Sequence, residues 1–159
     1  MFFTTMESPV GRLLLAGDEE RLHKLLFGGT PKPDWREDPA ALAEPVRQLR
    51  AYFAGELREF NLPLSPEGTP FQLGVWRELR RIPYGQTISY GELARRVGSP
   101  KGSRAVGLAN GANPIAIIVP CHRVIGSNGK LTGYGGGLKN KEWLLALERA
   151  LPLYAQQPA

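Results

Sequence analysis

A proline-rich stretch, Leu62–Pro70, places the strongest constraint on how this 159-residue chain can fold. Three prolines and one glycine fall within its nine residues. Each proline fixes φ and removes a backbone hydrogen-bond donor, so the stretch is typical of a linker. We therefore expect two small domains, residues 1–68 and 69–159.

The first half carries alternating short elements. Two apolar runs, Gly11–Ala16 and Arg21–Phe27, flank a polar Gly-Asp-Glu-Glu segment, which predicts two strands joined by a turn. Apolar residues then recur at helical spacing, so we expect a helix over Pro45–Ala54. It should pack on the strands through Val46, Leu49 and Phe53.

The second half begins with clear helix signals. Thr69 is a suitable N-cap and Pro70 a suitable first helical residue. The apolar stripe that follows consists of Phe71, Val75, Leu79 and Ile82. Ser89–Glu92 has the spacing of a capping box, which predicts a second helix that ends near Gly98.

A third helix is expected to open at Ser99–Pro100 after a very short turn, and two helices joined so tightly suggest a helix-turn-helix. This third helix would carry Lys101 and Arg104 near its start. Small residues follow, which would permit close approach to a nucleic-acid backbone: Ala105, Gly107, Ala109, Gly111 and Ala112. An ordinary α-hairpin, with small residues serving helix packing, is the alternative.

Charge is divided unevenly between the halves. Residues 1–70 contain 8 Lys and Arg against 11 Asp and Glu, whereas residues 71–159 contain 12 against 4, so the net charges are −3 and +8. A basic second half suggests a module that binds a polyanion, attached to a separate scaffold. A solvated basic surface would give the same count.

Composition also bears on disulfide bonding and on the cellular compartment of the protein. The single cysteine excludes an intramolecular disulfide and a multi-cysteine zinc site, which fits a reducing cytosol. The N-terminus lacks the basic region of a signal peptide, and no apolar run approaches the roughly 18 residues that span a bilayer. We expect a cytoplasmic protein with no membrane partner.

The single cysteine is a candidate nucleophile. Cys121 follows the apolar run Ile115–Val119, which predicts a buried strand, and precedes His122 and Arg123. Thiolate, and not thiol, attacks carbon, so a reactive cysteine needs a positive or proton-accepting neighbour, and either residue could serve. Alternatively, Cys121 is a small buried hydrophobe that ends a strand.

The C-terminal region offers a pocket wall and a carboxylate. The glycine-rich loop Gly126–Gly137 contains Tyr134, and glycine lets backbone approach a ligand closely. A helix is expected over Lys139–Leu151, and Glu148 falls within its apolar stripe of Trp143, Leu144, Leu147 and Leu151. An inward carboxylate needs a partner, so Glu148 could orient His122 in a Cys-His-Glu relay. A boundary residue that reaches solvent is the alternative.

Five segments together resemble the O6-alkylguanine-DNA alkyltransferases. They keep the order and spacing of that family through roughly residues 69–151, while the first half is less similar. The segments are I-P-Y-G-Q-T-I-S-Y-G-E-L-A at 82–94, S-P-K-G-S-R-A-V-G at 99–107, A-N-P at 112–114, P-C-H-R-V-I-G at 120–126 and G-Y-G-G-G-L-K-N-K-E-W-L-L at 133–145. The resemblance implies an α+β chain, with a small N-terminal RNase H-like αβ domain and a C-terminal winged-helix-like helix-turn-helix domain.

The resemblance further implies a single-use DNA repair activity. Duplex DNA would be bound in the minor groove, O6-alkylguanine flipped out, and its alkyl group passed irreversibly to Cys121. His122 would deprotonate the thiol through a water, Glu148 would orient His122, and Asn113 would brace the turn. No metal or cofactor is implied, and a monomer is expected.

The remaining site residues are likewise implied by the resemblance. Tyr90 would crowd a phosphate and help rotate the nucleotide outward, and Arg104 would replace the extruded base. Tyr134 would wall the pocket beside the Gly135 amide. The carbonyls of Cys121 and Val124 would accept the guanine amino group, and further DNA contacts would come from Lys101, Ser103 and Ala105.

Two departures from the family pattern leave substrate range open. Some relatives have serine at the position of Gly135 and proline at that of Ala116, so these changes leave the tolerance of bulky alkyl groups open. Activity on O4-alkylthymine is a separate question that the sequence also leaves open. Other classes also stay open. A non-enzymatic lesion binder would lack Cys121, a winged-helix regulator would prefer a DNA sequence and use the cysteine structurally or as a redox sensor, and a cysteine hydrolase would turn over.

Overall fold

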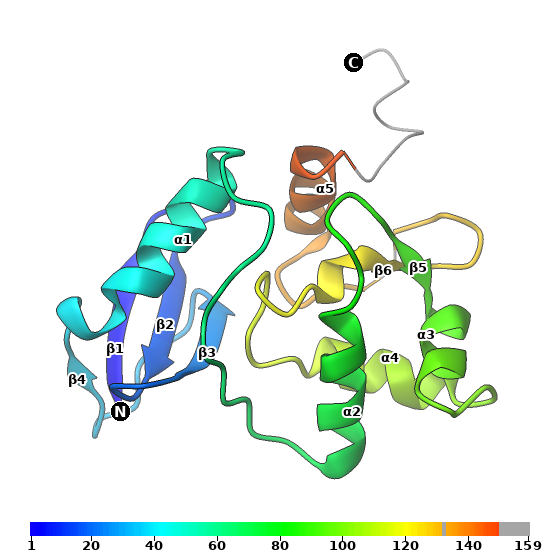
Figure 1. The fold of residues 1–159 in the computed structure, drawn as a ribbon, viewed down its shortest axis with the longest axis horizontal. Coiled ribbons are helices and arrows are strands. Elements are labelled where there is room, and N and C mark those ends of the chain that lie inside the picture. Colours follow the sequence, from blue (N-terminus) through cyan, green and yellow to red (C-terminus); the bar gives the residue numbers. More distant parts are fainter. Residues whose placement is uncertain (132, 150–159) are drawn as a thin grey trace. The chain divides into compact units, whose positions relative to one another are not determined.

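The computed structural model describes residues 1–131 and 133–149, and the chain divides into two compact units (Figure 1). One unit comprises Met1–Glu67 together with Pro114–Ala116, and the other comprises Gly68–Asn113 with the described residues from Ile117 onward. One unit holds a small sheet and the other is mainly helical, so the α+β prediction is confirmed. The exact boundary after residue 68 stays a prediction. Within the described ranges, no helix has the length and hydropathy needed to cross a bilayer.

The first unit is built on a four-stranded sheet with strand order β3-β2-β1-β4. Its strands are β1 (Phe2–Met6), β2 (Leu13–Gly17), β3 (Leu22–Phe27) and β4 (Arg36–Glu37). The predicted hairpin is confirmed as the antiparallel pair of β2 and β3. The sequence reasoning missed β1, which pairs antiparallel with β2, and the two-residue β4, which pairs parallel with β1.

The predicted helix of this unit is present as α1 (Ala43–Phe53), after a short 3-10 turn, η1 (Ala40–Leu42). The predicted buried face was wrong in part, because Val46 and Phe53 are only half-buried. The buried residues of α1 are Gln48, Leu49 and Tyr52. Burial of Gln48 is compensated, since its amide group donates to the Asn61 carbonyl at 3.0 Å and accepts from the Asn61 amide at 2.9 Å.

Two isolated bridges extend the pairing of β3. Leu22 bridges Leu64, so the proline-rich stretch is partly paired, and Leu25 bridges Ile115. The predicted strand over Ile115–Val119 was wrong beyond its first residue, because the rest forms turns and Ile117 adopts a φ of 70°. A left-handed β-branched residue cannot continue a strand. The run is nonetheless buried, as expected.

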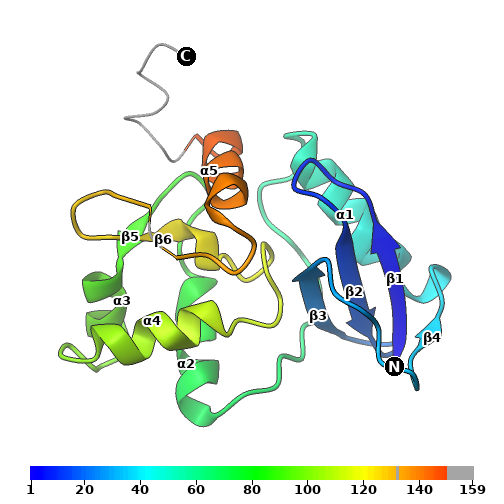
Figure 2. The same cartoon turned by 180° about the vertical axis from the view of Figure 1, so that it is seen from behind.

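Over its described residues, the second unit has four α-helices and a two-stranded parallel pair (Figure 2). The helices are α2 (Pro70–Leu79), α3 (Tyr90–Arg96), α4 (Ser103–Gly111) and α5 (Leu138–Leu147), and the strands are β5 (Ile88–Ser89) and β6 (Val124–Ile125). Helix α4 packs against both α2 and α3. The Thr69 cap and the Pro70 start are confirmed, and Ser89 caps α3.

Three details of these helices differ from the prediction. Phe71 is 42% exposed, and Trp76 supplies the missing packing, with its indole nitrogen donating to the Ala109 carbonyl at 2.8 Å. Helix α4 begins at Ser103 and not at Ser99, since the preceding residues form a turn closed by a hydrogen bond from the Gly102 amide to the Ser99 carbonyl. Lys101 therefore lies in that turn.

Helix α5 is shorter than predicted. It ends at Leu147 because Arg149 adopts a left-handed φ of 57°, a usual conformation just beyond a helix C-terminus. Glu148 is the C-cap residue. The predicted inward residue Leu151 lies outside the described residues.

Candidate active site

Cys121 begins a single 3-10 turn, η2 (Cys121–Arg123), that follows the buried run. The thiol-bearing residue is buried, and two asparagine side chains fix the backbone around it. Asn113 Nδ2 donates to the Val119 carbonyl at 2.8 Å, and Asn110 Nδ2 donates to the Cys121 carbonyl at 3.3 Å. The position of Sγ is therefore set by a pinned turn and not by a free loop.

The environment of Cys121 keeps its thiol protonated at rest. Burial raises the pKa of Cys121, while the side chains of Asn113 and Tyr134 and the charge of Lys141 act in the opposite direction. A buried thiol of this kind needs a base at the moment of reaction.

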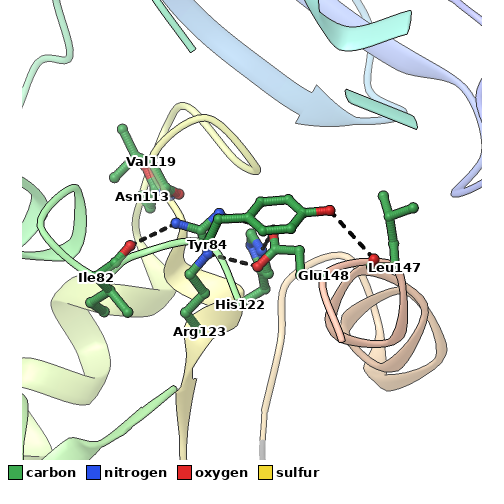
Figure 3. Close-up of polar contacts among 8 residues, drawn as sticks. All are labelled: Ile82, Tyr84, Asn113, Val119, His122, Arg123, Leu147 and Glu148. Atoms are coloured by element: carbon green, nitrogen blue, oxygen red, sulfur yellow. Dashed lines mark hydrogen bonds and ion pairs between the residues drawn. The ribbon is translucent and has the colours of Figure 1, made fainter. Parts of the chain in front are cut away.

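His122, the residue that follows Cys121, forms a buried pair with Glu148 (Figure 3). His122 Nε2 lies 2.8 Å from Glu148 Oε2, with both side chains fully buried. Burial lowers the pKa of His122, so the ring is neutral and a Nε2–H donating to the carboxylate leaves Nδ1 as a base. Among the described residues, Nδ1 has no hydrogen-bond partner. The arrangement can accept a proton from a neighbouring thiol.

Arg123 holds the carboxylate from the other side. Its Nε donates to Glu148 Oε1 at 2.8 Å, its Nη2 donates to Glu148 Oε2 at 3.0 Å, and its Nη1 donates to the Ile82 carbonyl at 2.7 Å. Figure 3 shows Tyr84 beside this fork, with its hydroxyl directed at the Leu147 carbonyl, 3.4 Å away. The guanidinium thus joins three segments of the unit, which favours a bracing role over thiolate activation.

Glu148 is ionised because of these partners. Burial alone would raise the pKa of Glu148. The hydrogen bonds and charges of His122 and Arg123 outweigh burial and lower this pKa to about 2. The alternative of a solvent-reaching boundary residue is therefore excluded by the geometry, since Glu148 is 2% exposed. A permanently charged carboxylate fixes both the tautomer and the orientation of the imidazole.

Lys141 is a site residue that the sequence reasoning missed. It is fully buried, its Nζ donates to the Val124 carbonyl at 2.6 Å, and burial lowers the pKa of Lys141 to about 8. Nζ lies 5.9 Å and 6.0 Å from the ring centroids of Tyr90 and Tyr134. A signal was available, because Lys141 precedes Glu148 by seven residues and so lies on the same helical face.

Three of the predicted pocket residues, Tyr90, Val124 and Tyr134, lie around this ammonium. Tyr90, at the start of α3, and Tyr134, in the glycine-rich loop, are half-buried, and Gly135 is exposed. The Val124 carbonyl, expected to accept a guanine amino group, already accepts from Lys141 and keeps one further lone pair. The described residues contain no cluster of three or more His, Cys, Asp or Glu side chains that could hold a metal ion.

The predicted DNA-contacting residues line the outer face of α4 and the turn before it. Lys101, Ser103, Arg104 and Ala105 are all exposed. Gly107 faces the Tyr90 ring, because a Cβ atom built there would lie 3.8 Å from Tyr90 Cδ1. Helix α4 and the tyrosine of the pocket are therefore neighbours.

The His122 imidazole is expected to remain neutral below its ordinary pKa of about 6.5. In a His23→Gln protein, His122 is the only histidine, and its ring NMR shifts should report a titration midpoint below the ordinary value. The unfolded chain takes up this proton near its ordinary pKa, so the stability contributed by neutral His122 is lost as pH falls below that value. A titration midpoint at or above the ordinary value would show that burial does not lower the pKa of His122.

Comparisons with known proteins cover both units. Residues 1–66 match the ribonuclease-like domain, and residues 70–150 the DNA-binding domain, of 6-O-methylguanine DNA methyltransferase. The chain is 59% identical over 153 residues to a methylated-DNA–protein-cysteine methyltransferase of Methanosarcina acetivorans, spanning 93% of this chain and 98% of that protein. A protein of the same name from Mycolicibacterium paratuberculosis is 58% identical over 151 residues, spanning 92% of each chain. The crystal structure of Mycobacterium tuberculosis OGT in complex with DNA superposes with a TM-score of 0.90 at 55% identity, covering 95% of this chain and 94% of that one.

Proposed function

Because the chain belongs to the 6-O-methylguanine DNA methyltransferase family, we propose that it repairs DNA by transferring an alkyl group from guanine O6 to Cys121. One observation carries the choice of acceptor. The only thiol of the chain is buried and immediately precedes His122, which is hydrogen-bonded to Glu148. The Methanosarcina acetivorans relative, which is named a methylated-DNA–protein-cysteine methyltransferase, is 59% identical to this chain over 98% of its own length.

The chemistry balances without a cofactor. The thiol proton passes to His122 Nδ1 through a water, and the resulting imidazolium is stabilised by the ionised Glu148. The sulfur then attacks the alkyl carbon in line, forming a C–S bond as the C–O6 bond breaks. Guanine leaves with the bonding electrons, and a donor such as the Tyr90 hydroxyl or a loop amide stabilises its negative charge. The thioether is not hydrolysed, so each molecule acts once.

The substrate must be brought to this buried sulfur. An alkyl carbon stacked inside a duplex is out of reach, and flipping the nucleotide costs a few kcal/mol, less for a poorly paired base. Arg104, exposed on α4, offsets part of this cost by filling the gap in the stack, and Tyr90 assists the rotation. The small residues of α4 suit a minor-groove approach, which favours lesion recognition over sequence reading.

The substrate chemistry identifies the partner as double-stranded DNA that carries O6-alkylguanine, and a monomer is proposed. Since the reaction needs a reduced thiol at Cys121, a reducing compartment such as the cytoplasm is proposed.

Mass spectrometry tests the proposal directly. The protein is mixed with duplex DNA that contains one O6-methylguanine, and intact and peptide masses are recorded. One methyl group should appear on Cys121, in a one-to-one ratio with the DNA lesion repaired. Unmodified protein that binds the lesion tightly would instead indicate a non-enzymatic binder, and preference for a DNA sequence would indicate a regulator.

Replacing Lys141 by methionine is expected to slow methyl transfer by roughly 100-fold. The substitution removes the ammonium whose charge favours the Cys121 thiolate and whose Nζ is bonded to the Val124 carbonyl. The pH at which Cys121 reacts with iodoacetamide should rise in the variant. A matched control is Lys139→Met, an exposed lysine on the same helix. If both variants transfer methyl groups at the wild-type rate, Lys141 has no part in the reaction.

A further inference from the structure

Leu108 is unusually exposed for a large apolar residue. Its side chain is 72% exposed, compared with 48% for Leu138 and 42% for Phe71, the next most exposed large hydrophobic side chains of the described residues. A single exposed leucine is ordinary in itself. Its position in the fold is what gives it meaning.

Leu108 lies on the outer face of α4, four residues after Arg104. Residues four apart stack on one helical face, about 6 Å apart along the axis. The neighbours on this face are small, namely Ala105, Gly111 and Ala112, and all three are exposed. Leu108 and Arg104 are therefore the two long side chains that project from an otherwise flat helix surface.

We propose that Leu108 is an apolar minor-groove contact, packing on deoxyribose rings beside the point where Arg104 enters the base stack. The proposal rests on the function proposed above. The minor groove is only about 6 Å wide, and proteins that bind it commonly use leucine and similar side chains to occupy and open it.

This contact would differ physically from the basic contacts around it. Under the proposed function, Lys101 would bind a phosphate and Arg104 would replace the flipped base, and phosphate contacts weaken as the salt concentration rises. Burial of the leucine side chain releases no counterion, so its contribution is the same at every salt concentration. A Cβ atom at the neighbouring Gly107 would lie 3.8 Å from Tyr90 Cδ1, so the helix that carries Leu108 packs beside the tyrosine proposed to guide the nucleotide into the pocket.

Leu108→Ala should therefore weaken binding to undamaged duplex DNA by roughly 5- to 20-fold, by the same factor from low to high salt. The slope of log K against log salt should be unchanged. Methyl transfer from a duplex at sub-saturating protein should fall by a similar factor, whereas transfer from free O6-methylguanine base should not change. Leu108→Met should restore most of the loss, and Leu138→Ala serves as a matched leucine truncation outside the helix-turn-helix.

The outcomes separate this proposal from the one on which it rests. If Leu108→Ala binds duplex DNA as the wild type does, or if its deficit varies with salt, Leu108 makes no apolar contact and the inference is wrong. Slower reaction with the free base would place the defect in the pocket and also overturn it. Failure of the wild-type protein to accept a methyl group on Cys121 would refute the repair function alone, because the binding series on undamaged DNA would still test Leu108.

Discussion

The Cys121→Ser protein is expected to transfer no methyl group while binding duplex DNA as tightly as the wild type. A serine hydroxyl is a far weaker nucleophile than a thiolate, and this site raises even the thiol pKa through burial. No other thiol in the chain could take over. The substitution is nearly isosteric, so the turn held by Asn110 and Asn113 should persist. Mass spectrometry after incubation with O6-methylguanine duplex, together with a binding titration on the same duplex, measures both properties.

The stoichiometry of the wild-type protein supplies the matching control. Each molecule should repair one lesion and then stop, because the product thioether is stable. More repaired lesions than protein molecules would contradict the single-use reaction and favour a hydrolase. Methyl transfer to another residue in the Cys121→Ser protein would show that the acceptor had been misidentified.

Local signals predicted the helices of the second unit better than the course of the chain between them. The cap at Thr69 depends on residues within one turn, and its capping box is present with both hydrogen bonds. The run Ile115–Val119 was misread because a short apolar run indicates burial without distinguishing a strand from a buried turn. The left-handed backbone conformation of Ile117 is not one that isoleucine prefers, so it is imposed by the surrounding structure and cannot be predicted from the residue type.

In the candidate site, too, some features could be predicted from local sequence and others could not. The placement of Glu148 in an apolar stripe led to the expectation of a polar partner, and the hydrogen bond to His122 is present, although the catalytic roles stay predictions. Buried cations were harder to anticipate. The sequence places Arg123 two residues after Cys121 and Lys141 seven residues before Glu148, but only the tertiary fold shows that both cations are enclosed and bonded to a carboxylate or a carbonyl.

Arg123→Ala is expected to destabilise the folded protein by about 3–5 kcal/mol, because it leaves the buried carboxylate of Glu148 without its bidentate partner. Loss of the bond to the Ile82 carbonyl adds to the effect. Urea unfolding at neutral pH measures this loss of stability. Arg95→Ala is the matched control, because Arg95 forms an exposed ion pair with Glu92 and its removal should change the free energy of unfolding little.

The pH dependence of this loss distinguishes an electrostatic cause from lost packing. In the wild type the pKa of Glu148 is about 2, below its ordinary value of 4.5, so the stability it contributes is present above pH 4.5 and is lost as pH falls toward 2. In Arg123→Ala the carboxyl group lacks the guanidinium, so its pKa rises and it takes up a proton at a higher pH. The difference in unfolding free energy between the two proteins should therefore narrow in acid. A difference that stayed constant with pH would mean that Arg123 stabilises the turn through packing alone.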